Sequence, residues 1–371
     1  MTAGPAAPSA PGPTSPSEPG RRWPERASLP FDLAVAAVAY LTVTVGLAPW
    51  YSERLFDRDA FEGYYDQGIY QFRIVGPQVV LWLERSVLGG DPIGSHLVVG
   101  ARQPHAADLF TAIFLLNAVS LLGIVLLARG ILRRARVPEP ARSLVMVVLV
   151  VALAASLSTV TPYDLPSLLL VLATLVVANR RAPWDLLAVP LVVLGVLTRE
   201  SALIVVAGLV AHALVVPPTR RRIGVIVAVA VAGLAAYVGV RVGSSSPALW
   251  EALTIRGNLV RLIQWMGLGM MAATYLVWWR VCTLAGLGEA RSRRGVGWFW
   301  LLATPYVLTA LLTGYWFEVR LLIPMVVVEL WLRASLAQRQ DTSSVQSPSP
   351  LEDSASTRSD DETTSTPAGS S

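Results

Sequence analysis

Long apolar segments recur through most of the chain and limit its fold more than any other feature of the sequence. Apolar runs of roughly 17–22 residues match the ~20 residues that a helix needs to cross the hydrocarbon core of a bilayer. Hydrophobic residues make up 54% of the chain and charged residues 15%, whereas a soluble domain has about 25% charged residues. We therefore predict an all-α polytopic membrane protein.

Ten transmembrane helices are expected between two polar tails. They run approximately over residues 31–50, 107–128, 143–160, 165–179, 184–198, 201–217, 223–241, 263–283, 296–314 and 320–336. Residues 71–88 predict an additional amphipathic helix at the interface, because their apolar residues alternate in phase with polar ones. Residues 1–29 and 338–371 are rich in small and polar residues, which predicts disordered tails on either side of a transmembrane domain over 30–337.

Arginine supplies all of the basic charge, because the sequence contains no lysine. If the N-terminus is cytoplasmic, most arginines fall on the cytoplasmic side, for example Arg133, Arg221 and Arg333. Cytoplasmic loops of membrane proteins carry such an excess of positive charge. We therefore expect a multi-pass protein of the cell (plasma) membrane with both termini in the cytoplasm. The arginines flank apolar segments and form no soluble basic face, which argues against a nucleic-acid partner.

Residue types exclude several kinds of site. Cys282 is the single cysteine, so the chain has no internal disulfide and no multi-cysteine metal site. The three histidines lack the spacing of metal ligands. A Walker-type phosphate loop needs a lysine, which the chain lacks. The sequence therefore predicts no metal centre of a familiar kind.

A large polar loop, residues 51–106, follows the first predicted span and is expected on the outer side. Its segment 50–77, WYSERLFDRDAFEGYYDQGIYQFRIVGP, is the most densely charged and tyrosine-rich part of the chain outside the tails. Any one of its acids is better explained as solvated than as catalytic. The acids are Glu53, Asp57, Asp59, Glu62 and Asp66.

Other charged residues near the ends of the predicted spans fall on the same outer side. They are Asp164 in TPYDLP, Arg199 and Glu200 in LTRES, Arg241, Glu251, Arg256, and Glu318 and Arg320 in YWFEVR. A helix cap, a turn or an interfacial ion pair would account for each alone. Charges at membrane depth are costly and usually face a cavity or pair with one another. Their common side indicates an active site or a binding cavity at the outer face.

A family resemblance rests on four short segments, ten or so spans and a large charged first outer loop. The segments are YYDQGIYQFRIVGP, PYDLP, LTRES and WFEVR. Together these features resemble the GT-C superfamily of integral-membrane glycosyltransferases, which use sugars linked to a polyprenyl phosphate, and within it an uncharacterised bacterial branch. The resemblance covers about residues 31–336. One departure is that the paired acids of the better-known protein mannosyltransferases and oligosaccharyltransferases are not adjacent here.

The resemblance implies inverting transfer of a sugar to an acceptor hydroxyl at the outer face, with the catalytic acid on the first outer loop. Such transfer needs a carboxylate to take the hydroxyl proton, and we expect Asp66, followed by Asp59. Arginine binds phosphate bidentately, and the expected ligands of the donor phosphate are Arg199, Arg320 and Arg73. The residues expected to orient these arginines or to bind substrate are Glu200, Glu318, Asp164, Tyr64, Tyr65 and Tyr70.

The expected partners are a polyprenyl-phosphate-linked sugar and the lipid bilayer, while the acceptor remains open among a glycan, a lipid and a protein. No cofactor is required, although dispersed carboxylates allow a divalent metal. Other functions also fit the sequence. These are a flippase or transporter of lipid-linked sugars, another outer-face transferase such as a glycan polymerase, ligase or acyltransferase, and a non-enzymatic scaffold. A transporter should have broken helices and polar residues near the membrane midplane.

Overall fold

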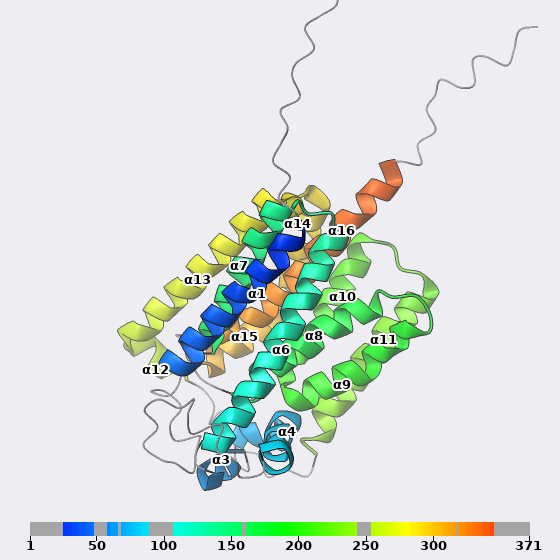
Figure 1. Ribbon diagram of the computed structural model, residues 1–371. Helices are drawn as coiled ribbons and strands as arrows, with labels where there is room; N and C mark the ends of the chain where they lie inside the picture. The colour runs from blue at the N-terminus through cyan, green and yellow to red at the C-terminus, as the bar shows by residue number, and fades with distance from the viewer. Residues whose placement is uncertain are drawn as a thin grey trace, which may run out of the picture.

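The computed structural model describes residues 25–47, 58–65, 68–88, 107–157, 161–242, 254–316 and 318–344. Within these ranges the protein is helical and has no strand. Eleven helices form the bundle: α1 (Glu25–Leu41), α6 (Ala107–Arg134), α7 (Glu139–Ser156), α8 (Asp164–Ala178), α9 (Ala188–Thr198), α10 (Ile204–Val215), α11 (Arg220–Gly239), α13 (Leu262–Cys282), α14 (Ala290–Leu302), α15 (Thr304–Thr313) and α16 (Ile323–Ser344). α1 begins at the same end of the bundle as α16 ends (Figure 1).

Five helical segments are long and apolar enough to cross a membrane. They are Ser28–Gly46, Asp108–Arg134, Glu139–Ser156, Arg220–Gly239 and Leu262–Leu287. The consecutive helices α14 and α15 qualify together as a sixth, with a bend of 51° between them. The chain is thus a polytopic helical membrane protein with five or six candidate spans by length and composition. Helices lie on all ten predicted segments, but the number of crossings remains a prediction.

Three helices are apolar but short. α8 has 15 residues, α9 has 11 and α10 has 12. At 1.5 Å per residue, even a helix of 15 residues is only about 22 Å long, less than the ~30 Å hydrocarbon core. Turns of 3₁₀ helix, Trp184–Leu187 and Glu200–Leu203, extend α9 and α10 at their N-terminal ends. Their length explains why they fall outside the set of full-length candidate spans.

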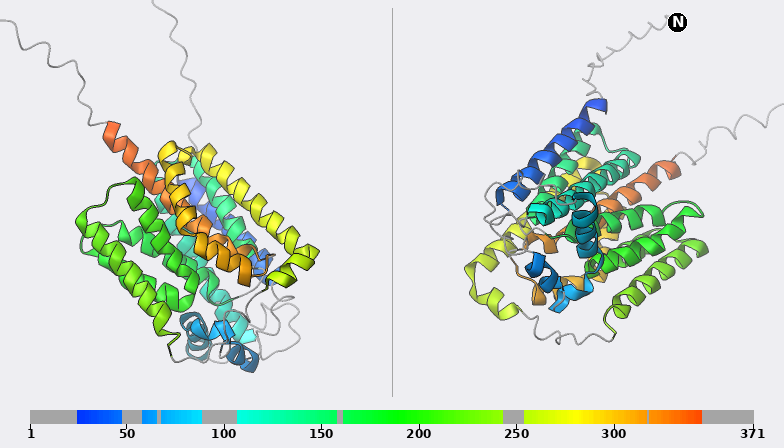
Figure 2. Two further views of the ribbon diagram at one scale, coloured as in Figure 1. Left: turned by 180° about the vertical axis from the view of Figure 1, so that it is seen from behind. Right: turned by 60° about the horizontal axis from the view of Figure 1, so that its bottom comes forward.

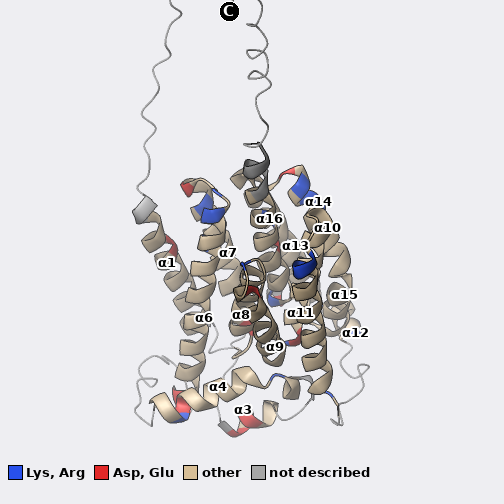
Figure 3. Cartoon of the chain, turned by 90° about the vertical axis from the view of Figure 1, so that its right-hand side faces the viewer, with Lys and Arg blue, Asp and Glu red and all other residues tan. Residues whose placement is uncertain are grey.

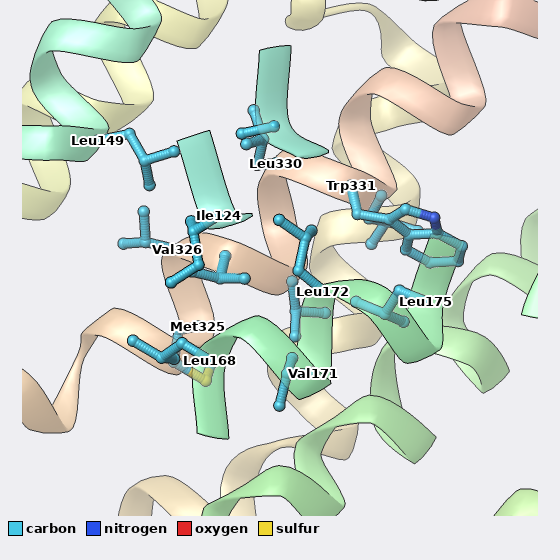
Figure 4. Close-up of a cluster of buried hydrophobic side chains, with 14 of the residues drawn as sticks. Ile124, Leu149, Leu168, Val171, Leu172, Leu175, Met325, Val326, Leu330 and Trp331 are labelled. Carbon is cyan, nitrogen blue, oxygen red and sulfur yellow. The ribbon is translucent and has the colours of Figure 1, made fainter. Parts of the chain in front are cut away.

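The core lies where α8 and α16 pack together against α6. Apolar side chains from these helices, including Ile124, Leu172 and Leu330, are fully buried (Figure 4). Every residue of α16 from 323 to 336 is buried, although this stretch contains Glu329 and Arg333. A central helix of this kind is hidden from lipid by its neighbours, so it can contain charges that a lipid-facing span cannot.

Glu329 and Arg333 form a buried polar network that crosses three helices. The Glu329 carboxylate accepts hydrogen bonds from Tyr275 and Trp278 of α13, from Trp300 of α14, and from Arg333 one turn further along α16. Both charged side chains have no exposed surface. Arg333, which the sequence analysis counted among the cytoplasmic arginines, is thus paired with Glu329 inside the bundle, and its side of the membrane stays a prediction.

The bend between α14 and α15 has a local cause in the sequence. Pro305, the second residue of α15, has no N–H and cannot bond to the carbonyl of Leu301. The backbone therefore leaves the path of α14 at Ala303 and starts a new helix. This bend turns the end of α14 and the start of α15 along one wall of the cavity described below.

Two short helices, α3 (Arg58–Tyr65) and α4 (Val75–Leu83), lie across the end of the bundle opposite the start of α1 (Figures 1 and 2). Figure 3 shows α4 running roughly at right angles to the long helices above it. The helix predicted over 71–88 is thus divided into α4 and a π-helical turn, Glu84–Leu88, and a 3₁₀ turn, Gly68–Phe72, precedes it.

The terminal helices extend beyond the predicted domain. α1 begins at Glu25 and α16 continues to Ser344, so helix covers residues 25–29 and 338–344, which the sequence assigned to the tails. The segments ERASL and QRQDTSS include good helix formers such as Glu, Arg, Ala, Leu and Gln, which allow each helix to continue past the apolar stretch. The remaining residues of both predicted tails lie outside the described ranges.

Candidate functional site

The charged residues of four separate segments meet where α4 lies against the bundle. These segments are the turn before α4, the start of α8, the junction of α9 with α10, and the residues before α16. Three of them, all except the start of α8, border a cavity of about 610 Å³. Six of the predicted site residues line it, namely Tyr70, Arg73, Arg199, Glu200, Glu318 and Arg320.

Asp164 joins two of these segments from behind the cavity. It is the first residue of α8 and only 1% exposed. Its carboxylate accepts hydrogen bonds from Arg199, from Arg320 at 3.3 Å and from the Thr161 hydroxyl at 2.7 Å. The N-terminal end of a helix also favours a negative charge. Asp164 therefore holds two arginines from distant parts of the chain beside each other.

Arg73 and Glu200 form the second connection, between the segment before α4 and the bundle. Arg73 donates from Nη2 to Glu200 Oε1 at 3.0 Å and from Nε to Oε2 at 3.4 Å. Arg73 is 7% exposed, whereas the Glu200 side chain keeps 31% of its surface exposed. Because Arg199 and Glu200 are consecutive, this pair adjoins the one made by Asp164.

Arg320 is held from two sides. Its Nε donates to Glu318 Oε2 at 3.0 Å, its Nη2 lies 2.9 Å from the same oxygen in an ion pair, and its Nη1 donates to Asp164. Arg199 differs, since only its Nη1 is used in an ion pair within the described chain. A guanidinium has five N–H donors. Arg199 lines the cavity and has the most donors left for an anion bound there.

Tyrosine rings connect the arginines to α3. The ring of Tyr163 lies under two guanidiniums, with its centroid 4.2 Å from Arg73 Cζ and 5.7 Å from Arg199 Cζ. Tyr65 packs edge-on against Tyr163 at 6.2 Å, and Tyr64 stacks on Tyr70 at 4.2 Å. A cation is stabilised by such a position over an aromatic face. Burial raises the pKa of Tyr65, which keeps its hydroxyl neutral.

The electrostatic state of Glu200 limits its chemistry. Burial alone would raise the pKa of its carboxyl, but the charge and hydrogen bonds of Arg73 and the charge of Arg199 lower it to about 2. A general base works best when its pKa lies near the working pH. Glu200 is therefore suited to holding Arg73 in place and poorly suited to accepting a proton.

Away from the arginines, the cavity has an apolar wall that follows the helices. α10 contributes Ile204, Ala207 and Val210 to it, and α14 and α15 contribute Leu302 and Ala310. A polar end with three arginines therefore continues into an apolar channel between helices. This combination matches a ligand with an anionic head and a hydrocarbon tail, because binding sites bury apolar groups and orient a few polar ones.

The two acids predicted as general base are not placed at the cavity by the described structure. Asp66 lies outside the described residues. Asp59 is exposed on α3, on the side away from the buried Phe61 and Tyr65. Glu62, one turn from Asp59, lies 3.7 Å from Arg85 in an exposed pair. Within the described residues, no group of three or more His, Cys, Asp or Glu side chains is arranged to hold a metal.

Sequence reasoning missed Tyr163, Thr161 and Tyr306 as parts of the site. Thr161 and Tyr163 precede Asp164 in the segment TPYDLP, so nearness to a charged residue at a span end was the available signal. Tyr306 lines the cavity and donates its hydroxyl to the Leu321 carbonyl at 2.8 Å. Its position in an apolar run, next to Pro305, gave no such signal.

Comparison of the chain with models of known protein families, with curated proteins and with solved structures finds no match. The geometry of the cavity and of the residues around it therefore has to support any functional proposal.

Proposed function

We propose that this protein is a membrane glycosyltransferase that moves a sugar from a polyprenyl-phosphate donor to an acceptor hydroxyl, with inversion. Its architecture is GT-C-like, with ten membrane crossings, both termini in the cytoplasm and the active site at the outer face of the cell membrane. One observation carries this proposal. The cavity of about 610 Å³ has Arg73, Arg199 and Arg320 at one end and an apolar wall along α10, α14 and α15.

The two parts of the cavity correspond to the two parts of such a donor. The phosphate binds Arg199 first, since this guanidinium has the most unused N–H groups, and Arg320 adds positive charge beside it. The polyprenyl tail follows the apolar wall toward the membrane interior. Ala207 and Val210 of α10 lie on that path. Asp164, Glu200 and Glu318 keep the guanidiniums in position.

The reaction breaks the bond between the anomeric carbon and the phosphate oxygen and forms one between that carbon and the acceptor oxygen. The proton of the acceptor hydroxyl passes to a carboxylate, and the electron pair of the broken bond leaves with the polyprenyl phosphate. Asp66 of the first outer loop is the proposed base. Glu200 does not fit this role, because its pKa of about 2 makes it a weak base.

A transfer assay with Asp66→Asn tests the assignment. Purified protein would receive short-chain polyprenyl phosphates carrying radiolabelled hexoses or pentoses, together with a membrane extract that supplies the acceptor. We expect transfer to fall at least 100-fold in Asp66→Asn, which is the lower range for loss of a general base. The matched control is Glu62→Gln, which removes a carboxylate from the same loop. Wild-type activity in Asp66→Asn would refute Asp66 as the base.

A transporter of lipid-linked sugars is favoured by one feature, the bend of 51° between α14 and α15 at the cavity wall. Broken helices are common at transport sites. The charged groups of this cavity, however, gather at its end near α4. Reconstituted protein distinguishes the two functions, because a transporter moves the labelled lipid-linked sugar between leaflets without forming a glycosylated acceptor.

A further inference from the structure

Three arginines lie together at the end of the bundle opposite α3 and α4. Arg134 ends α6, while Arg180 and Arg181 follow the last turn of α8. With Trp184 and with Gln338 of α16 they line a second cavity, of about 680 Å³. In Figure 3 the ribbon is coloured for basic residues at this end of α6, away from α3 and α4.

These arginines differ from their neighbours in their partners. At the same end, Arg129 is paired with Asp32 and Glu139, and Arg221 is paired with Asp185. Across the described ranges, no ion pair joins any of the three cavity arginines to an acid, and no acid lines the cavity. Three like charges around one space repel one another, and a bound anion removes that repulsion.

The chemistry of the lining favours a phosphate group as this anion. A guanidinium matches a phosphate with two parallel N–H groups, and three guanidiniums offer several such pairs. The side-chain amides of Asn179 and Gln338 also line the cavity and provide further N–H donors. Trp331 forms part of the wall and is buried, so the cavity has a rigid apolar side.

The surroundings place this anion at a membrane surface. Trp184 is 65% exposed and Leu186 beside it is 55% exposed. Exposed tryptophan beside arginine is typical of the boundary between hydrocarbon and water. Basic pockets between helices at that depth bind lipid head groups. We propose that this cavity binds the phosphate of an anionic membrane lipid, separately from the cavity near α4.

Lipid retention in native mass spectrometry tests the proposal. The probes are short-chain phosphatidylglycerol and phosphatidylcholine with the same chains, added to the purified full-length protein in detergent. We expect the wild type to prefer phosphatidylglycerol. Arg134→Gln with Arg180→Gln should weaken that binding about 25-fold, or about fivefold per arginine. Arg133→Gln is the matched control, because Arg133 is exposed in the same turn of α6 and does not line the cavity.

Stability and competition complete the test. The double variant should unfold at the same temperature as the wild type or higher, because it loses repelling charges and no ion pair. Equal phosphatidylglycerol binding by the wild type and a folded double variant would overturn the site. If millimolar inorganic phosphate displaces the lipid from the wild type, a soluble phosphate ester replaces the lipid as the ligand, and the lipid assignment is overturned.

Discussion

At the scale of single residues, the site depends most on Asp164, because one carboxylate positions two arginines that lie 121 residues apart in the sequence. Both Arg199 and Arg320 are largely buried beside it. A buried guanidinium that loses its carboxylate remains an uncompensated charge. Asp164 therefore acts mainly as a structural residue, because it fixes the positions of the two guanidiniums at the cavity.

We predict that Asp164→Ala destabilises the protein by about 3–5 kcal/mol, the usual cost of removing one partner of a buried ion pair. Thermal unfolding of the purified protein in detergent measures this loss. Glu62→Gln is the control, because its partner Arg85 is 60% exposed and such surface pairs contribute about 0–1 kcal/mol. An unfolding temperature of Asp164→Ala close to that of the wild type would show that the two arginines do not need this carboxylate.

At the scale of elements, the contact between α4 and the loop before α8 aligns α4 with the bundle. Gly76, in the first turn of α4, lies so close to this loop that an added Cβ would sit 2.4 Å from the Pro162 carbonyl oxygen. Only glycine allows this approach. Arg73, just before α4, depends on the same contact to reach Glu200.

We predict that Gly76→Ala pushes α4 away from Pro162 and lowers stability by about 1–3 kcal/mol, as overpacking does. Because α4 is then displaced together with Arg73, donor turnover should also fall. Thermal unfolding and the transfer assay provide the two measurements. Gly63→Ala in α3 is the matched control, since a Cβ there meets no atom within 4 Å. Equal effects of the two substitutions would mean that α4 accommodates the methyl group without moving.

At the scale of the whole molecule, apolar run length predicted the helices well, because a bilayer requires each span to satisfy its own backbone. Apolar run length was less informative about the contacts of helices that are buried inside the bundle and do not face lipid. α16 is an example, since Glu329 and Arg333 neutralise each other and the Glu329 carboxylate also accepts hydrogen bonds from Tyr275, Trp278 and Trp300 of other helices. A one-dimensional pattern cannot identify such partners.

The sequence could predict which residues share the end of the bundle that holds the candidate site, because the order of the helices alone brings the ends of alternate connections together. Arg199, Glu200 and Arg320 were grouped because every second loop of a helical bundle reaches the same end. Their individual pairings depend on side-chain geometry, as does the position of Tyr163 between Arg73 and Arg199. The orientation of that end relative to the membrane was inferred from arginine bias alone.

Orientation can be measured with single cysteines, because Cys282, the one native cysteine, is buried. Ala60→Cys places a thiol on the exposed side of α3, and Arg133→Cys places one at the other end of the bundle. On intact cells, a membrane-impermeant thiol reagent should label Ala60→Cys and spare Arg133→Cys until the membrane is opened. Labelling only of Arg133→Cys would invert the topology. The cavity with Arg199 would then face the cytoplasm, and the proposed outer-face transfer would fail with it.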